Sequence, residues 1–211
     1  MTIRAKIGGA ALAVIVIVAA GGLTIGLLQK LRPAGTTTSQ NVKTSRAAKT
    51  FPQISSNLSA ARQKILQTAK AEWQAQPTPT KYSDGADEPW CADFVSWVLS
   101  RSGLRMSNPN SGSWRIPGVA TLTDYFQSQV GVWQNINSGY TPQPGDVITY
   151  YGGAVGQHAE IITSVDGQNF TTVSGGLAKS VSLQEREIRD DKFGVQGFAD
   201  VDALAADLAE K

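Results

Sequence analysis

The chain has one cysteine and one histidine, Cys91 and His158, and both stand in contexts that suit covalent catalysis. Cys91 lies in EPWCADFVSW (88–97), which is typical of the first turns of a helix: Pro89 fits an early helical position, and Asp87 is a candidate cap. A thiol in a first turn faces the positive end of the helix dipole and unpaired N–H groups, which favour the thiolate. His158 opens the strand-like run HAEIIT (158–163). If folding brings the two together, the chain has a nucleophile and a base.

Cys91 and His158 each also have a non-catalytic interpretation. A lone buried cysteine usually behaves as a small apolar side chain, and a lone histidine on a strand is more often a structural or surface group. The sequence contexts of Cys91 and His158 favour the catalytic interpretation over these alternatives.

Three motifs carry a family resemblance: PWCADFVSW (89–97), PQPGDVI (142–148) and HAEII (158–162). Their order and spacing resemble the CHAP family, the cysteine- and histidine-dependent amidohydrolases/peptidases of the papain-like NlpC clan, over a stretch from about 58 to 201. The resemblance implies that Cys91 attacks an amide from a helix start and that His158 is its base on a strand. It also implies that the substrate is bacterial peptidoglycan.

The third catalytic position departs from the family pattern. Family members place Glu, Asp or Asn on the strand after the His strand, in a run like VEGN, whereas this chain has TTVSGG (171–176). Glu160 is the first candidate for the missing group, because residues two apart on a strand share a face. A solvated strand carboxylate is an equally good reading of Glu160. Ser174 is the second candidate, through its hydroxyl group.

Other residues are candidates for substrate contacts. The Cys91 N–H is placed to hold an oxyanion, with the hydroxyl of Tyr82 as a second donor. Trp90 can wall the site, and Trp114 stands on a turn-rich segment where substrate contact competes with simple loop packing. A single cysteine excludes an intramolecular disulfide, and without clustered Cys and His we expect no zinc site and no cofactor.

The hydrophobic pattern changes from helical to alternating along the chain. Helical spacing predicts a helix at 58–74 behind the cap Asn57, a helix from the Cys91 region to Gly103, and a third helix at 119–127. Alternation predicts strands at 147–151, 159–163, 170–173, 181–188 and 195–198, and an Ala-rich end predicts a closing helix over 200–211. Helices followed by strands indicate an α+β domain with an antiparallel sheet, the papain-like arrangement that the resemblance also implies.

The N-terminal segment is apolar. Residues 7–28 form a stretch of 22 residues without a charge, which is long enough to span a bilayer as a helix. Basic residues lie on both sides of this stretch. The rival interpretation is a signal peptide cleaved after Ala20. Because the apolar run continues to Leu28, we favour an uncleaved anchor that holds the domain outside the cytoplasm; cleavage would give a secreted protein. The predicted organisation is an anchor at 1–32, a flexible linker at 33–54, a catalytic domain at 55–204 and a tail at 205–211.

Charge is distributed unevenly along the chain. Residues 1–50 hold seven of the 19 basic residues and none of the 17 acidic ones, which leaves 12 against 17 and a balance of −5 in the rest. A basic segment beside an apolar one suits an anionic membrane surface. An acidic main domain without a basic stripe makes nucleic acid an unexpected partner.

These inferences define a first hypothesis and two rivals. The first is a membrane-anchored peptidoglycan hydrolase, an amidase or endopeptidase with a thiolate nucleophile. One rival is a catalytically inactive CHAP-fold module that binds the wall or acts as a scaffold, because the third position departs from the pattern. The other is a thiol hydrolase of proteins or small amides.

Overall fold

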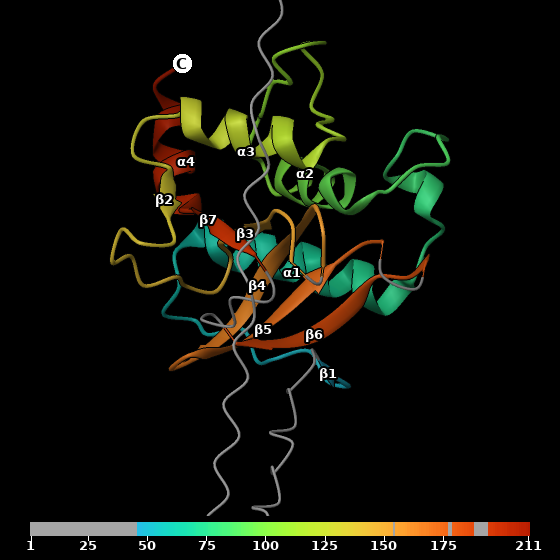
Figure 1. Cartoon of the computed structure of the whole chain (residues 1–211), viewed down its shortest axis with the longest axis vertical. Coiled ribbons are helices and arrows are strands. Elements are labelled where there is room, and N and C mark those ends of the chain that lie inside the picture. The colour runs from blue at the N-terminus through green and yellow to red at the C-terminus, as the bar shows by residue number, and fades with distance from the viewer. Residues whose placement is uncertain (1–45, 154, 177–178, 188–193) are drawn as a thin grey trace, which may run out of the picture. The chain divides into compact units, whose positions relative to one another are not determined.

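The computed structural model describes residues 46–211 apart from 154, 177–178 and 188–193 (Figure 1). All of them belong to the second of two units into which the chain divides, Val42–Lys211. The anchor predicted at 1–32 lies outside the described residues. Within the described part, none of the helices has the length and apolar character that crossing a bilayer requires.

The helices come mainly before the strands, as the sequence pattern predicts. Four α-helices and a short 3₁₀ turn are described: α1 (Ala60–Ala75), η1 (Pro79–Lys81), α2 (Cys91–Arg101), α3 (Val119–Ser128) and α4 (Val201–Ala209). The cap of α1 is Ser59, whose hydroxyl accepts from the Arg62 N–H, and not Asn57 as predicted. Pro89 and Asp87 lie before α2 and do not start it, since the helix begins at Cys91 behind Trp90.

The strands form one antiparallel sheet. Its order is β1-β6-β5-β4-β3-β7-β2, with every described pair antiparallel. The strand bounds are β1 (Arg46–Ala47), β2 (Trp133–Asn135), β3 (Val147–Tyr150), β4 (His158–Asp166), β5 (Asn169–Ser174), β6 (Ser182–Glu187) and β7 (Val195–Ala199). Figure 1 shows a twisted sheet with α1 passing behind β4, β5 and β6. The α+β class with an antiparallel sheet is therefore confirmed.

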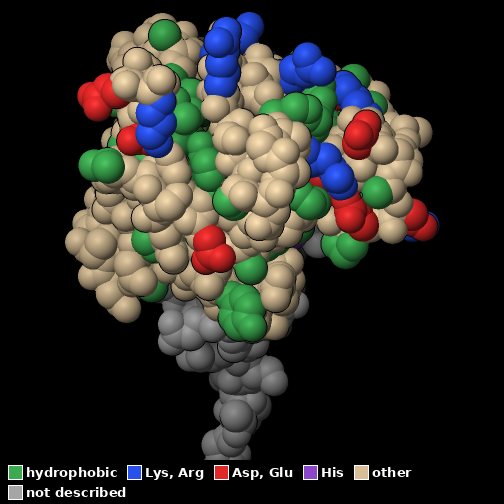
Figure 2. Space-filling view, turned by 90° about the horizontal axis from the view of Figure 1, so that it is seen from above, with side chains coloured by type: hydrophobic (Ala, Val, Ile, Leu, Met, Phe, Trp, Pro, Cys, Tyr) green, Lys and Arg blue, Asp and Glu red, His purple; other side chains and the backbone are tan. Residues whose placement is uncertain are grey.

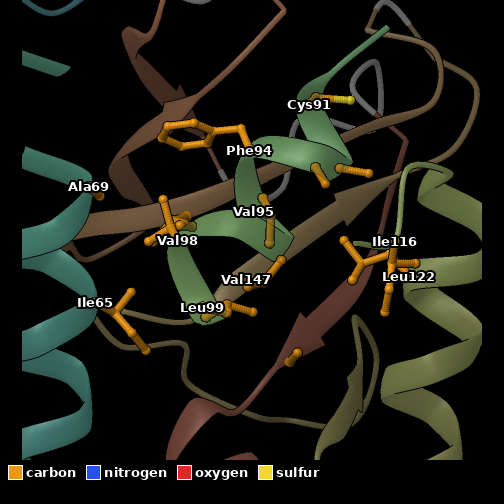
Figure 3. Packing of buried hydrophobic residues seen from close by; sticks show 14 of the residues in the cluster. Ile65, Ala69, Cys91, Phe94, Val95, Val98, Leu99, Ile116, Leu122 and Val147 are labelled. Atoms are coloured by element: carbon orange, nitrogen blue, oxygen red, sulfur yellow. The ribbon is translucent and has the colours of Figure 1, made fainter. Parts of the chain in front are cut away.

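The main core lies between the helices and the sheet. Figure 3 shows α2 between Ile65 and Ala69 of α1 on one side and Ile116 and Leu122 on the other. The middle of α2 is buried through Phe94, Val95, Val98 and Leu99, each fully inaccessible. Burial of such side chains contributes about 1.5–3 kcal/mol each relative to exposure, so α2 is fixed firmly and its first residue with it.

The predicted domain boundaries differ from the folded unit at both ends. β1 pairs with β6, and Phe51 is buried in the main core, so the end of the predicted linker at residue 54 lies inside the folded unit. At the other end, α4 continues to Ala209, and Leu208 packs against the core. The segment 205–211 is therefore largely the second half of a packed helix and not a separate tail.

Candidate active site

Cys91 is the first residue of α2. The preceding N-cap, Trp90, makes no side-chain hydrogen bond to the helix, so the first N–H groups keep no cap from it. Figure 3 shows the Cys91 sulfur at the end of the helix, beyond the side chains that bury its middle. The thiol is free and buried. A reactive sulfur at this point meets the N–H groups and positive dipole end of α2.

Gly176 keeps the space beside Cys91 open. A Cβ at Gly176 would lie 3.6 Å from the Cys91 backbone nitrogen and 3.8 Å from its Cβ, and the φ of +92° favours glycine in any case. The neighbouring Gly175 is required for packing, because a Cβ there would overlap the Trp90 ring. Gly176, which stands at one of the expected polar positions, and Gly175 beside it therefore both have a structural reason.

His158 is the first residue of β4 and lies opposite Tyr150 of β3. Only 5% of its surface is exposed. Its Nε2 lies 3.2 Å from Glu160 Oε1 and 3.3 Å from Ser174 Oγ, so both candidate orienting groups meet the same nitrogen. This geometry leaves Nδ1 as the ring nitrogen that can serve the thiol.

Glu160 is itself held by two further residues. Arg186 of β6 donates from Nη2 to Oε1 at 2.6 Å and from Nε to Oε2 at 3.2 Å. The hydroxyl of Tyr150 donates to Oε2 at 2.9 Å. Glu160 is completely buried, so it is not the solvated strand carboxylate that sequence reasoning left open.

The charges in this cluster shift the pKa of His158. Burial, the largest influence, lowers that pKa, but hydrogen bonds to Cys91 and Glu160 and the negative charges of both groups outweigh it and raise the pKa from 6.5 to about 9. For Glu160, burial raises the pKa, whereas contacts with His158 and Arg186 lower it to well below its usual range. The pair therefore favours an imidazolium beside a carboxylate.

Tyr82 does not take the predicted role of oxyanion donor. Its side chain is fully buried, and its hydroxyl donates to Glu72 Oε2 at 2.7 Å. Its ring stacks on Trp90 at 5.3 Å with an interplanar angle of 3°. Both rings also contact Phe94 of α2 edge-on, so the Tyr82 side chain has a packing role in the main core.

Trp114 is half-buried on its loop. The adjacent Arg115 forms ion pairs with Glu88 and, at 2.8 Å from Nε, with Asp93 Oδ1; the latter contact lacks the angles of a hydrogen bond. Burial raises the pKa of Asp93 to about 7. These pairs tie the Trp114 loop to both sides of Cys91, a link that sequence reasoning missed because Arg115 lies outside the recognised motifs.

The described part of the chain contains no cluster of candidate metal ligands. Among the described residues, no three His, Cys, Asp or Glu side chains gather as a metal site would require. Figure 2 shows one face of the molecule, on which basic and acidic side chains are interspersed among uncharged ones. The reactive groups described at the site are the Cys91 thiol, the His158 imidazole and the Glu160 carboxylate.

The site thus has a helix-borne thiol beside a strand-borne imidazole, on an α+β fold with an antiparallel sheet, which is the pair of groups that nucleophilic catalysis requires. Residues 81–176 match the family model of the CHAP domain, which agrees with the family resemblance of the sequence over that segment. The matched segment includes Cys91, His158, Glu160 and Ser174.

Known proteins add the following similarities. One similar solved structure is the crystal structure of Ly7917, with a TM-score of 0.45, 13% identity, and coverage of 65% of this chain and 61% of that chain. Another is the crystal structure of Ly7917 with the hydrolyzing product of MDP, with a TM-score of 0.35, 15% identity, and coverage of 65% and 62%. This chain thus spans less than two thirds of those chains. Among curated proteins, none matches the chain.

Proposed function

We propose that this chain is a peptidoglycan hydrolase, an amidase or endopeptidase that cleaves amide bonds with a thiolate nucleophile. The observation that carries the proposal is the position of the His158 ring, whose Nε2 lies 3.2 Å from a buried carboxylate while Cys91 raises its pKa. The CHAP match, which includes both residues, supports peptidoglycan as the substrate class.

Acylation begins with the Cys91 thiolate beside the His158 imidazolium. The sulfur attacks the amide carbonyl carbon and forms a C–S bond, and the carbonyl oxygen becomes an oxyanion. As the oxyanion collapses, the C–N bond breaks and His158 gives its proton to the leaving amine. The products of this half are a thioester on Cys91, a free amine and a neutral imidazole.

Deacylation uses the same groups in reverse. Neutral His158 takes a proton from water as the water oxygen attacks the thioester carbon, and the C–S bond then breaks to release the carboxyl product. The Cys91 thiolate and the His158 imidazolium are restored. Glu160 accepts the hydrogen bond from Nε2 throughout, which keeps Nδ1 turned toward sulfur and substrate.

The oxyanion site is proposed from the backbone. The Cys91 N–H stands at a helix start, where N–H groups and the dipole stabilise negative charge. Gly176 leaves room beside this N–H for a substrate oxygen. With Tyr82 occupied by Glu72, no tyrosine hydroxyl is needed in this proposal. Trp90 and Trp114 stay proposed contacts of the substrate.

We also propose that the domain acts outside the cytoplasm, held at a membrane by residues 7–28. The uncharged run and its basic flanks support an uncleaved anchor. N-terminal sequencing of the protein from a membrane fraction tests this directly. A mature protein that begins at Gly21 in the soluble fraction would instead define a secreted enzyme.

Digestion of purified peptidoglycan tests the function. The wild-type chain should release fragments with new amino and carboxyl ends, which mass spectrometry assigns to one amide bond. Cys91→Ala should abolish release, while Lys64→Ala, on the exposed side of α1, should retain it. Intact wall after treatment with folded wild-type protein would favour a binding module, and cleavage of casein without cleavage of wall would favour a general thiol hydrolase.

A further inference from the structure

The carboxylate of Glu160 has more contacts than the orientation of an imidazole requires. Oε1 faces His158 Nε2 and accepts from Arg186 Nη2, and Oε2 accepts from the Tyr150 hydroxyl and from Arg186 Nε. Because these donors approach from β3, β4 and β6, the carboxylate is restricted to one orientation. Side chains of two other strands therefore determine where the third group of the site stands.

Burial of the Glu160 carboxylate disfavours its ionised form, and the contacts of this carboxylate compensate for that cost. Glu160 and its contacts are shielded from water, and a buried carboxylate needs a cation beside it to stay ionised. The His158 imidazolium meets this need only while it is protonated. Once His158 is neutral, Arg186 is the one cation among the described side chains that contact Glu160.

We propose that Arg186, assisted by Tyr150, is a positioning residue that keeps Glu160 ionised and fixed in orientation while His158 gains and loses its proton. The inference rests on the proposed function, in which His158 changes charge in each half of the reaction. The titratable and charged groups that face His158 and Glu160 come from four elements: Cys91 of α2, Tyr150 of β3, Glu160 of β4 and Arg186 of β6.

Loss of Arg186 should slow the two half-reactions unequally. Acylation starts with the imidazolium, which itself balances Glu160. Deacylation needs neutral His158 with a free Nδ1. Without Arg186, the His158–Glu160 pair retains a proton, either on both ring nitrogens or on Glu160 with the remaining ring proton on Nδ1. Neither form accepts a proton from water at Nδ1, so the thioester on Cys91 should accumulate.

The single histidine allows a direct test in the purified full chain. In ¹⁵N-histidine spectra, every imidazole signal belongs to His158. Arg186→Met should raise the apparent pKa of His158, and Arg186→Lys should restore it in part. Tyr150→Phe should raise it by a smaller amount. Tyr140→Phe is the matched control, because its hydroxyl also donates to a buried carboxylate at 2.9 Å, that of Asp146, and it should leave the titration unchanged.

The kinetic readout is the lifetime of the thioester. After acid quenching, mass spectrometry should find a larger fraction of Arg186→Met acylated on Cys91 than of wild type. Each unit of upward pKa shift should slow deacylation at neutral pH by about tenfold. Acylation, followed as release of the first amine, should change less.

Three results would overturn the inference. A fall of the His158 pKa toward 6.5 in Arg186→Met would mean that Arg186 only packs the site, and an unchanged titration would mean that it is not coupled. Should Arg186→Met fail to fold, an unchanged titration in both Tyr150→Phe and Arg186→Lys would decide against it. If the wild-type chain forms no thioester with peptidoglycan, the proposed function fails. The His158 titrations of the variants would still show whether Arg186 is coupled to His158.

Discussion

Two arginines are buried in the described part of the chain, Arg62 and Arg186, and their surroundings differ in kind. Arg62 of α1 forms ion pairs with three aspartates: Asp146 at 2.8 Å, Asp200 at 2.9 Å and Asp202 at 2.6 Å. Arg186 of β6 contacts Glu160, which in turn contacts the His158 imidazole. Each cluster also includes a tyrosine that donates to its central carboxylate, Tyr140 in the first and Tyr150 in the second.

Buried charge serves stability in the Arg62 cluster, whereas in the Arg186 cluster it serves the proposed proton transfer. The Arg62 cluster joins α1 to the segment before β3 and to the N-cap of α4, and Gly145 is packed against the Arg62 stem. None of its members changes charge in the proposed reaction. The Arg186 cluster includes His158, which changes charge in the proposed reaction. There, the proposed role of the arginine is to keep Glu160 ionised in both charge states of the imidazole.

The largest expected effect is that of Glu160→Gln. The amide keeps the size of the side chain but removes the charge that supports the His158 imidazolium, so the His158 pKa should fall below 9. Peptidoglycan turnover should fall by roughly 10²–10⁴-fold, the range seen when an orienting group or an acid–base is lost. Digestion assays and ¹⁵N-histidine titration measure the two quantities.

Asp146→Asn is the matched control, since it removes the charge of the buried carboxylate at the centre of the Arg62 cluster. Its stability should fall, while its turnover per folded molecule should stay at the wild-type value. A large loss of turnover in folded Asp146→Asn protein would show that the two clusters are not separate in function.

Arg62→Met should produce the largest loss of stability. It leaves the buried Asp146 without its cation, and such a change costs on the order of 3–5 kcal/mol. The measurement is the free energy of unfolding in urea. The His158 titration of the folded variant should match wild type; a shifted titration would show that the two clusters are coupled.

The pH dependence of stability should separate the clusters again. The folded-state pKa of His158 is raised to about 9 from 6.5, so its stabilising effect is fully present below pH 6.5 and is lost as pH rises through about 9. The loss should be at most about 3 kcal/mol. Urea unfolding across this range measures it, and in Glu160→Gln the dependence should weaken. A wild-type stability that rises between pH 6.5 and 9 would contradict this assignment.

The elements with strong local patterns could be predicted from the sequence. The alternating runs became β3 to β7, and the helical runs became α1 to α4 with small changes at their ends. Glu160 was identified by the two-residue period of a strand, and Ser174 by its motif position; the structure brings both to His158 Nε2. A local pattern is sufficient to identify Glu160 and Ser174, because a single strand or a single motif determines where each side chain lies.

Residues whose roles depend on the order of strands could not be predicted. Arg186 reaches Glu160 because β6 lies beside β5 and β5 beside β4, and nothing in the sequence SLQERE distinguishes a buried arginine from a solvated one. The burial of Arg62, which lies in an amphipathic helix, could not be predicted for the same reason. The short β2 was missed because its three residues are defined only by pairing with β7. The role predicted for Tyr82 was wrong because nothing in the sequence indicates that its hydroxyl donates to Glu72 of α1.

The smallest expected effect is that of Ser174→Ala. Ser174 Oγ lies 3.3 Å from His158 Nε2 and 3.4 Å from Glu160 Oε1, so its loss leaves the imidazole with the stronger, charged acceptor. A neutral hydrogen bond contributes about 0.5–1.5 kcal/mol, which corresponds to a fall in turnover of roughly 2- to 10-fold. Thr172→Ala, two residues earlier on the same face of β5, is the control and should leave turnover unchanged. If Ser174→Ala instead reduces turnover as strongly as Glu160→Gln, the hydroxyl at the family's usual position is the main orienting group. The Arg186 cluster would then resemble the Arg62 cluster in serving stability alone.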